Sequence, residues 1–288
     1  MSQTNSRIVD TKPEEITQAF EKALSRHGYG FQYAVLKEVA SLFSSQRSHW
    51  MPWVPEFPVE VQGSGTRIDL ILRHRRRPLF LVCECKRANP ALSNWCFARA
   101  TQAYDPSFSG RSYLEMVHMV GDKVQAGLVD LVDSSRIYQI ALEVRSDDKG
   151  ETSSKGRGEI EDAATQACRG FNGLIDFVAS RQDMISKEES YFGFIPAIIT
   201  TARLLATEAN VSSADLTTGQ VPKLEPPLEE KDWIWYEYPQ SPGLKHSLQL
   251  VEPDSDLRTI VYQEYIRRIA VIRPSGLANF LGMNVWYP

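Results

Sequence analysis

Three residues in the first third of the chain combine the side chains that phosphodiester chemistry needs. Glu84 and Lys86 are two positions apart in the apolar run LFLVCECK, which spans residues 79–86. Residues at i and i+2 of a β-strand point to the same face, so a carboxylate and an ammonium are expected side by side. Asp69 lies in the preceding apolar run, RIDLIL, over residues 67–72. The two runs together predict a polar site on otherwise apolar strands.

The segment between these runs predicts a β-hairpin. It covers residues 74–78, HRRRP, which is a length typical of a hairpin connection. In one register Asp69 lies opposite Glu84. In the register shifted by one turn residue, Asp69 lies opposite Val82 and Glu84 takes the diagonal position. Both registers place the two carboxylates and the ammonium on one face, within side-chain reach.

Two carboxylates beside an ammonium suit a hard divalent cation next to a phosphate. Mg²⁺ is commonly held by one or two carboxylates while it keeps several waters. The ion lowers the pKa of a bound water and stabilises charge on phosphoryl oxygens. Lys86 can orient or deprotonate the attacking water and offset developing negative charge. Glu38, on a helix expected before the hairpin, could complete a first or second metal site.

Each of these residues also has a purely structural interpretation. Glu84 and Lys86 could form an ion pair on a solvated strand face. The rest of that strand is apolar enough to be buried, and buried charges need a partner or a metal, which favours the site. For Glu38 an ordinary surface position on the helix is an equally good interpretation.

The spacing of apolar residues elsewhere predicts the elements that position this site. Helices are expected over residues 13–27, 31–45, 159–179 and 275–281 and, in pieces, over 91–133. Strands are expected near residues 59–61, 68–72, 79–85, 137–144, 192–206, 232–238 and 266–272. The Pro- and Trp-rich start of segment 50–61 is expected to be irregular. This order predicts one α/β domain over residues 1–288.

The residues around the hairpin resemble the motif of the PD-(D/E)xK, or restriction-endonuclease-like, nuclease superfamily. The resemblance makes Asp69 the family's aspartate and Glu84 with Lys86 its (D/E)xK. It makes Glu38 a metal-supporting glutamate on the preceding helix. It also implies a glutamine on the crossover helix that contacts the site, which is Gln166, or Gln102 if the helix near residue 100 is the crossover. The family's proline is replaced by Ile68, and no QxxxY motif is present.

The resemblance covers about residues 31–206 and implies a mixed central sheet flanked by helices. Residues 159–179 and 192–206 would be the crossover helix and the strand after it. Residues 91–144 would then be an inserted helical elaboration, and residues 207–288 a C-terminal β elaboration.

Charge is distributed unevenly along the chain. The whole chain has 32 Lys and Arg against 36 Asp and Glu, a formal net charge of −4, which excludes a bulk polycation that coats nucleic acid. The hairpin is nevertheless rich in arginine, which predicts local contacts to phosphates. A solvated turn is the alternative. The candidate contact residues are Arg73, Arg75, Arg76, Arg77 and Arg87.

Several other classes of protein are excluded or disfavoured. The four cysteines and five histidines show no zinc-binding spacing, and no phosphate-binding loop or dinucleotide fingerprint is present. No apolar run reaches the roughly 18 residues of a membrane span. The polar N-terminus lacks the apolar core of a secretory signal, so a cytoplasmic location is expected.

The sequence therefore predicts a Mg²⁺-dependent endonuclease, with Mn²⁺ able to substitute, that acts on nucleic acid and most readily on DNA. The resemblance implies a prokaryotic setting such as restriction or anti-phage defence. One alternative is a restriction-fold module that binds or assembles without turnover. Another is a nuclease subunit that is activated only by a partner or by formation of a homo-oligomer.

Overall fold

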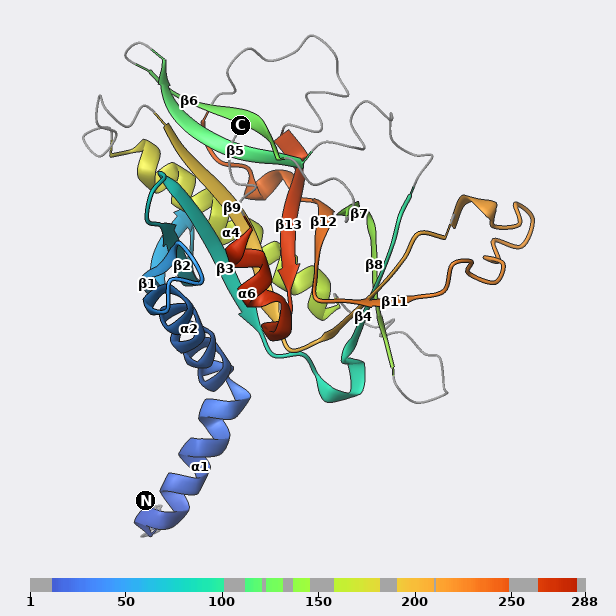
Figure 1. Cartoon of the computed structure of the whole chain (residues 1–288), viewed down its shortest axis with the longest axis horizontal. Helices are drawn as coiled ribbons and strands as arrows, with labels where there is room; N and C mark the ends of the chain where they lie inside the picture. Colours follow the sequence, from blue (N-terminus) through green and yellow to red (C-terminus); the bar gives the residue numbers. More distant parts are fainter. Residues whose placement is uncertain are drawn as a thin grey trace, which may run out of the picture.

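The computed structural model describes residues 12–100, 112–120, 123–131, 137–145, 158–181, 191–209, 211–248 and 264–283. These residues form an α/β structure in which a mixed sheet is flanked by helices, as the sequence predicts (Figure 1). Among the helices of this described part, none combines the length and the apolar character needed to cross a membrane.

Seven strands form the path of the main sheet. In spatial order they are β1 (Trp50–Val61), β2 (Ser64–His74), β3 (Leu79–Lys86), β9 (Tyr191–Thr200), β13 (Ile266–Ile272), β12 (Trp233–Pro239) and β7 (Ile137–Tyr138). β1, β2 and β3 are antiparallel neighbours, whereas β9 is parallel to β3 and β13 is parallel to β9. β12 is antiparallel to β13. The sheet is therefore mixed, with a hairpin-linked half and a parallel centre.

The segment expected to be irregular is instead a long edge strand. β1 covers all of Trp50–Val61 and includes three prolines. Proline cannot donate a main-chain hydrogen bond, so it is tolerated on an edge strand, and β1 ends the strand order of this sheet. Its pairing with β2 shifts register between Pro52 and Val54. The prolines thus interrupt the pairing without preventing the strand.

The prediction of helical pieces over residues 91–133 is wrong. This stretch contains the 3₁₀ turn η1 (Pro90–Leu92) and the strands β4 (Asn94–Ala98), β5 (Ser112–Val120) and β6 (Lys123–Leu131). β5 pairs with β6 and with β9. The pairing of β5 with β9 joins segments that are distant in the sequence. Pairing of this kind overrides local propensity and cannot be predicted from apolar spacing alone. β4 belongs to a second sheet with β8 (Ile140–Val144), β10 (Arg203–Thr207) and β11 (Glu229–Lys231).

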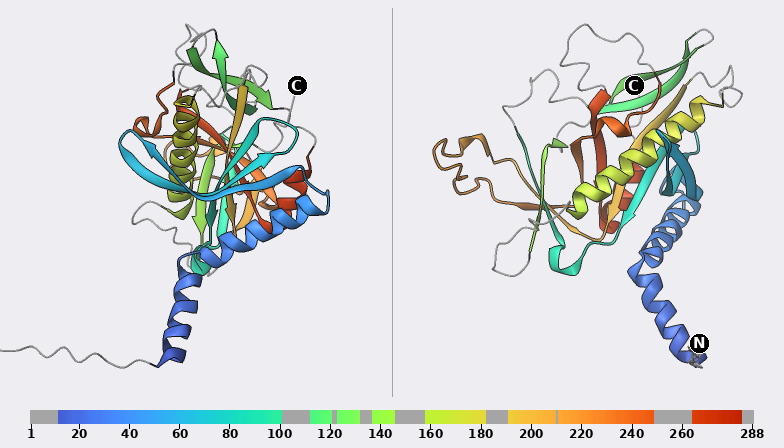
Figure 2. Two further views of the ribbon diagram at one scale, coloured as in Figure 1. Left: turned by 90° about the vertical axis from the view of Figure 1, so that its left-hand side faces the viewer. Right: turned by 180° about the vertical axis from the view of Figure 1, so that it is seen from behind.

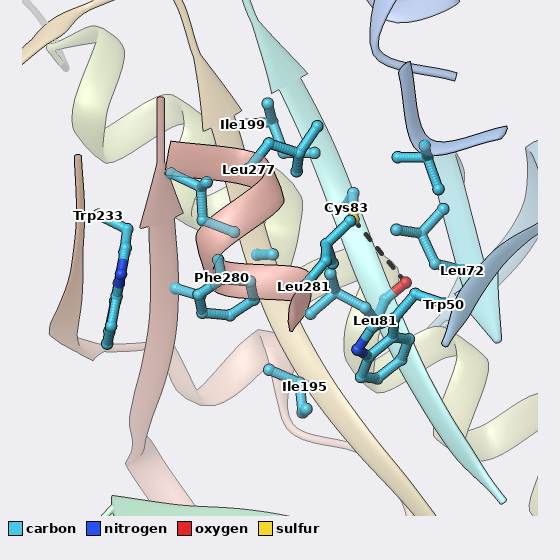
Figure 3. Close-up of a cluster of buried hydrophobic side chains, with 14 of the residues drawn as sticks. Trp50, Leu72, Leu81, Cys83, Ile195, Ile199, Trp233, Leu277, Phe280 and Leu281 are labelled. Atoms are coloured by element: carbon cyan, nitrogen blue, oxygen red, sulfur yellow. Dashed lines mark hydrogen bonds between the residues drawn. The ribbon is translucent and has the colours of Figure 1, made fainter. Parts of the chain in front are cut away.

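Helices cover both faces of the main sheet. On one face, α2 (Tyr29–Ser44) and α6 (Pro274–Gly282) pack onto a buried apolar cluster built from several strands. Figure 3 shows Leu277 and Phe280 of α6 within this cluster, beside Trp233. On the other face, α4 (Glu159–Ala179) crosses the strands, as Figure 2 shows from behind. The helix α1 (Pro13–Arg26) has no buried residue and projects from the body.

Two glycines allow α4 to lie close to the sheet. The helix α4 is continuous through Gly170 and Gly173. A Cβ atom on Gly173 would lie 2.7 Å from Cγ2 of Val59, and one on Gly170 would lie 3.0 Å from Cγ1 of Ile68. The glycines are therefore required by close packing against β1 and β2 and do not interrupt the helix.

We expect Gly173→Ala to destabilise the protein by about 1–3 kcal/mol, because overpacking outweighs the helix propensity that alanine adds. Gly30→Ala is the matched control, since Gly30 is also helical but a Cβ atom there would have no neighbour within 4 Å. Urea denaturation of both variants measures the effect. A Gly173→Ala protein as stable as the wild type would contradict the packing argument.

Candidate active site

The strand registers bring three carboxylates into one row. The pairs Leu70–Cys83 and Ile71–Val82 of the β2–β3 ladder, continued by one residue, place Asp69 opposite Glu84. This is the first of the two registers that the sequence allowed. On the other side of β2, the pairs Pro55–Leu70 and Phe57–Ile68 place Glu56 opposite Asp69. Glu56, Asp69 and Glu84 therefore follow one another across β1, β2 and β3.

Asp69 is anchored by the main chain of β3. The ladder between β2 and β3 ends at the pair Leu70–Cys83. Beyond that point the main-chain N–H of Cys85 donates a hydrogen bond to Oδ2 of Asp69 at 2.8 Å. The carboxylate thus takes the place of a ladder partner, which fixes its position next to Glu84 and Lys86. Cys85 itself packs in the apolar cluster beneath α2, as expected for the opposite face of the strand.

A buried glutamine links the row to α2. The amide nitrogen of Gln32 donates to Oε1 of Glu56 at 2.7 Å and to the main-chain oxygen of Asp69 at 2.8 Å. Gln32 is 5% exposed. Glu56 has a φ of 51°, and left-handed backbone at a residue other than glycine is uncommon and gathers at functional sites. Neither residue is predicted from the sequence. The segment that carries Glu56 is expected to be irregular, and the approach of Gln32 depends on how α2 packs against the strands.

The row opens into a polar pocket of about 430 Å³ between α2, the end of β3 and α4. Asp69, Glu84 and Lys86 all line this pocket, so the structure brings together the three residues that carry the sequence prediction. Gln166 of α4 and Arg87 line it as well. Gln102 lies outside the described residues.

Glu38 is the predicted ligand that the structure does not place in the site. It is exposed on α2 and does not line the pocket. Gln32 is the residue of α2 that contacts the row, and six residues further along a helix correspond to about 240° around its axis. Glu38 therefore faces elsewhere, and Glu56 from β1 supplies the third carboxylate instead.

The arginines of the hairpin turn are also separated from the carboxylates. Arg73, Arg75, Arg76 and Arg77 lie at the turn end of β2 and β3, whereas Glu84 and Lys86 lie at the opposite end of β3. Leu79, the first residue of β3, is five residues from Glu84, about 16 Å along the strand at roughly 3.3 Å per residue, and Arg77 lies beyond it in the turn. The expectation of a basic hairpin tip beside the active site is therefore wrong. The extended strand β3 keeps the turn away from the carboxylates. Among the candidate contact residues, only Arg87 lines the pocket.

The surroundings of the carboxylates oppose their ionisation. Burial, followed by the charge of Asp69, raises the pKa of Glu84 to about 8. Burial also raises the pKa of Asp69 to about 6, although the hydrogen bond from Cys85 opposes the shift. The charge of Lys86 acts to lower both pKa values but does not cancel the effect of burial. Burial is the main cause of both shifts, so the site lacks the positive charge that two ionised acids would need.

A divalent cation fits this deficit of positive charge. Within the described residues, no three His, Cys, Asp or Glu side chains are arranged to hold a metal ion by themselves. Mg²⁺ does not need such a cage, because it is often bound by one or two carboxylates, with water and substrate phosphates completing its shell. Asp69 and Glu84 are the carboxylates suited to that role, and Glu56 adds charge behind them.

Comparisons with known proteins identify no relative. No protein-family model matches the chain, and no curated protein or solved structure matches it.

Proposed function

We propose that this chain is a Mg²⁺-dependent nuclease that hydrolyses phosphodiester bonds, with DNA as its substrate. The observation that carries the proposal is the placement of Asp69 opposite Glu84, with Lys86 two residues further along β3, in one polar pocket. Asp69 also ties β2 to β3 by accepting the N–H of Cys85, but within the described residues the side chain of neither Glu84 nor Lys86 forms a hydrogen bond or ion pair that would explain its place beside it.

The order of elements supports a restriction-endonuclease-like core. β1, β2 and β3 form an antiparallel meander, α4 crosses the sheet, and β9 returns parallel to β3. This is the order that the resemblance implies for the hairpin, the crossover helix and the next strand. Strands β4 to β8 separate β3 from α4, at the position of the expected insertion.

The chain's own residues divide the work of hydrolysis. Asp69 is held rigidly by the N–H of Cys85, so it can fix the position of a cation or of a water beside the scissile phosphate. Lys86 shares a strand face with Glu84 and can orient the attacking water and offset charge on the phosphoryl oxygens. When bound, Mg²⁺ would supply a lower pKa for a coordinated water and additional stabilisation of phosphoryl charge. Gln166 can hydrogen-bond the substrate from the α4 wall.

A module that binds or assembles without turnover is the competing proposal. The formal net charge of −4 favours it, because a chain of net negative charge does not attract nucleic acid in bulk. Lys86 argues for catalysis, since a binding module has no need of an ammonium aligned with the acids.

A cleavage assay on supercoiled plasmid separates these proposals. We expect the full-length wild-type protein to convert plasmid to nicked and linear forms with Mg²⁺ or Mn²⁺ and to leave it intact with EDTA. Single-stranded DNA and RNA circles in parallel reactions identify the substrate. Absence of cleavage on every substrate with either metal would contradict the nuclease, and calorimetric titration with Mg²⁺ would then show whether the pocket binds metal at all.

A further inference from the structure

A second pocket adjoins the candidate active site. It measures about 590 Å³, and Arg26, Arg87 and Glu159 line both pockets. One wall is the face of α1 that carries Lys22 and Arg26, and the other is the segment that follows β3. The two pockets therefore adjoin at these shared residues, and the groove that they line together runs from Asp69 and Glu84 along α1.

The cations of this groove are not neutralised by the protein. Within the described part of the chain, Lys22, Arg26 and Arg87 form no ion pair with a carboxylate. Arg87 is instead steadied by a hydrogen bond from its Nη1 to the main-chain oxygen of Ser25, at 2.7 Å. Three cations along one polar groove are suited to successive phosphates.

The nearby acids do not cancel this charge. One carboxylate oxygen of Glu159 accepts a hydrogen bond from the N–H of Asn89 at 2.9 Å, which fixes this acid in place but leaves its negative charge. Glu21 is the other acid that lines the second pocket. The second pocket thus keeps three basic side chains against two acids, next to an active site that attracts phosphate only with a cation present.

An aromatic side chain completes the groove. Tyr29, at the first turn of α2, lines the active-site pocket and is 41% exposed. Aromatic rings next to a phosphate-binding groove are the usual platform for unpaired bases, worth about 1–3 kcal/mol for each stacked base. A base can reach such a ring only when it is not paired in a duplex.

We propose that this groove binds a single nucleic-acid strand, an inference that rests on the proposed nuclease function. The scissile phosphate lies at Asp69, Glu84 and Lys86, and the following phosphates contact Arg87, Arg26 and Lys22. The volume of each pocket lies in the range of about 300–1,000 Å³ that is typical of small-molecule sites. A pocket of this size suits the nucleotides of a single strand. The substrate is therefore single-stranded, or a duplex opened locally.

Fluorescence anisotropy tests the path of the strand. We would titrate the full-length wild-type protein and Arg26→Ala into labelled oligo(dT), oligo(U) and a DNA duplex of equal length, with Ca²⁺ in place of Mg²⁺ to fill the cation site while cleavage is prevented. Arg76→Ala removes the same charge at the distant hairpin turn and serves as the comparison. We expect oligo(dT) to bind more tightly than the duplex. Arg26→Ala should weaken oligo(dT) binding about 10-fold and reduce the slope of log K against log salt by about 1.

The outcomes separate this inference from the proposed function. Equal losses in Arg26→Ala and Arg76→Ala, or tighter binding of the duplex, would overturn the path along α1. Tighter binding of oligo(U) would keep the path and change the substrate to RNA. Cleavage by the wild type is scored separately with Mg²⁺. If it occurs while Arg26→Ala binds normally, only the path is wrong. If Arg26→Ala loses binding but the wild type never cleaves, the strand path stands and the nuclease does not.

Discussion

Substituting alanine for Lys86 is expected to slow Mg²⁺-dependent cleavage by a factor of about 10²–10⁴, the usual contribution of a positioned proton-transfer group. The lysine lies on the same strand face as Glu84 and lines the pocket, where in the proposed mechanism its ammonium would meet the scissile phosphate and the attacking water. Its removal leaves the apolar contacts of β3 unchanged, and the fold should survive.

Single-turnover cleavage with enzyme in excess measures this effect on the chemical step. Lys37→Ala is the control, because Lys37 is an exposed lysine of α2 that does not line the pocket. It should cleave at the wild-type rate. Thermal unfolding of both variants shows whether the fold is intact. A folded Lys86→Ala protein with full single-turnover activity would remove Lys86 from the proposed mechanism.

Replacing Glu84 with glutamine is expected to abolish cleavage and yet to stabilise the metal-free protein. The folded-state pKa of Glu84 is about 8, above its ordinary value of 4.5. The folded state therefore holds this proton more tightly than the unfolded state does. Its contribution to stability is complete below pH 4.5 and is lost as the pH rises through about 8. At pH 8.5 Glu84→Gln should exceed the wild type by on the order of 3 kcal/mol.

Urea denaturation at pH 5.5 and pH 8.5, with EDTA, measures this difference. The wild type should lose stability between the two pH values, and Glu84→Gln should lose much less. Added Mg²⁺ should recover stability in the wild type at pH 8.5 but not in the variant. Glu38→Gln is the matched control and should behave as the wild type, because Glu38 lies outside the pocket. If the free energy of unfolding of the wild type does not change between these pH values, the pKa of Glu84 is not raised by its surroundings.

The sequence predicts the elements whose apolar pattern is local, which are the hairpin and the helix α4. The runs around Asp69 and Glu84 are apolar, short and separated by a five-residue connection, which predicts the hairpin. The apolar stripe of residues 159–179 predicts α4 with the bounds that the structure has, Glu159–Ala179. The hairpin limited the register to two choices, and the structure has the one that sets Asp69 opposite Glu84.

The missed features depend on contacts between distant segments. Glu56 is in the site because β1 pairs with β2, yet its proline-rich strand lacks a clear alternating pattern. Gln32 contacts the row because α2 packs against β1 and β2, an approach that no spacing encodes. A glutamate on the preceding helix fits the family resemblance, which points to Glu38, but the direction of its side chain depends on how α2 is rotated against the sheet. The turn arginines lie outside the site because β3 is longer than an arginine side chain can span.

The most direct test of the proposed nuclease is a plasmid-nicking assay that compares wild type with Asp69→Asn in Mg²⁺. The substitution removes the charge of the anchored carboxylate and keeps its size, so β2 and β3 should pair as before. We predict nicking by the wild type, none by Asp69→Asn at equal protein concentration, and none by either with EDTA. Equal nicking by the two proteins would contradict the proposed site, because cleavage would then come from residues other than the Asp69–Glu84 pair.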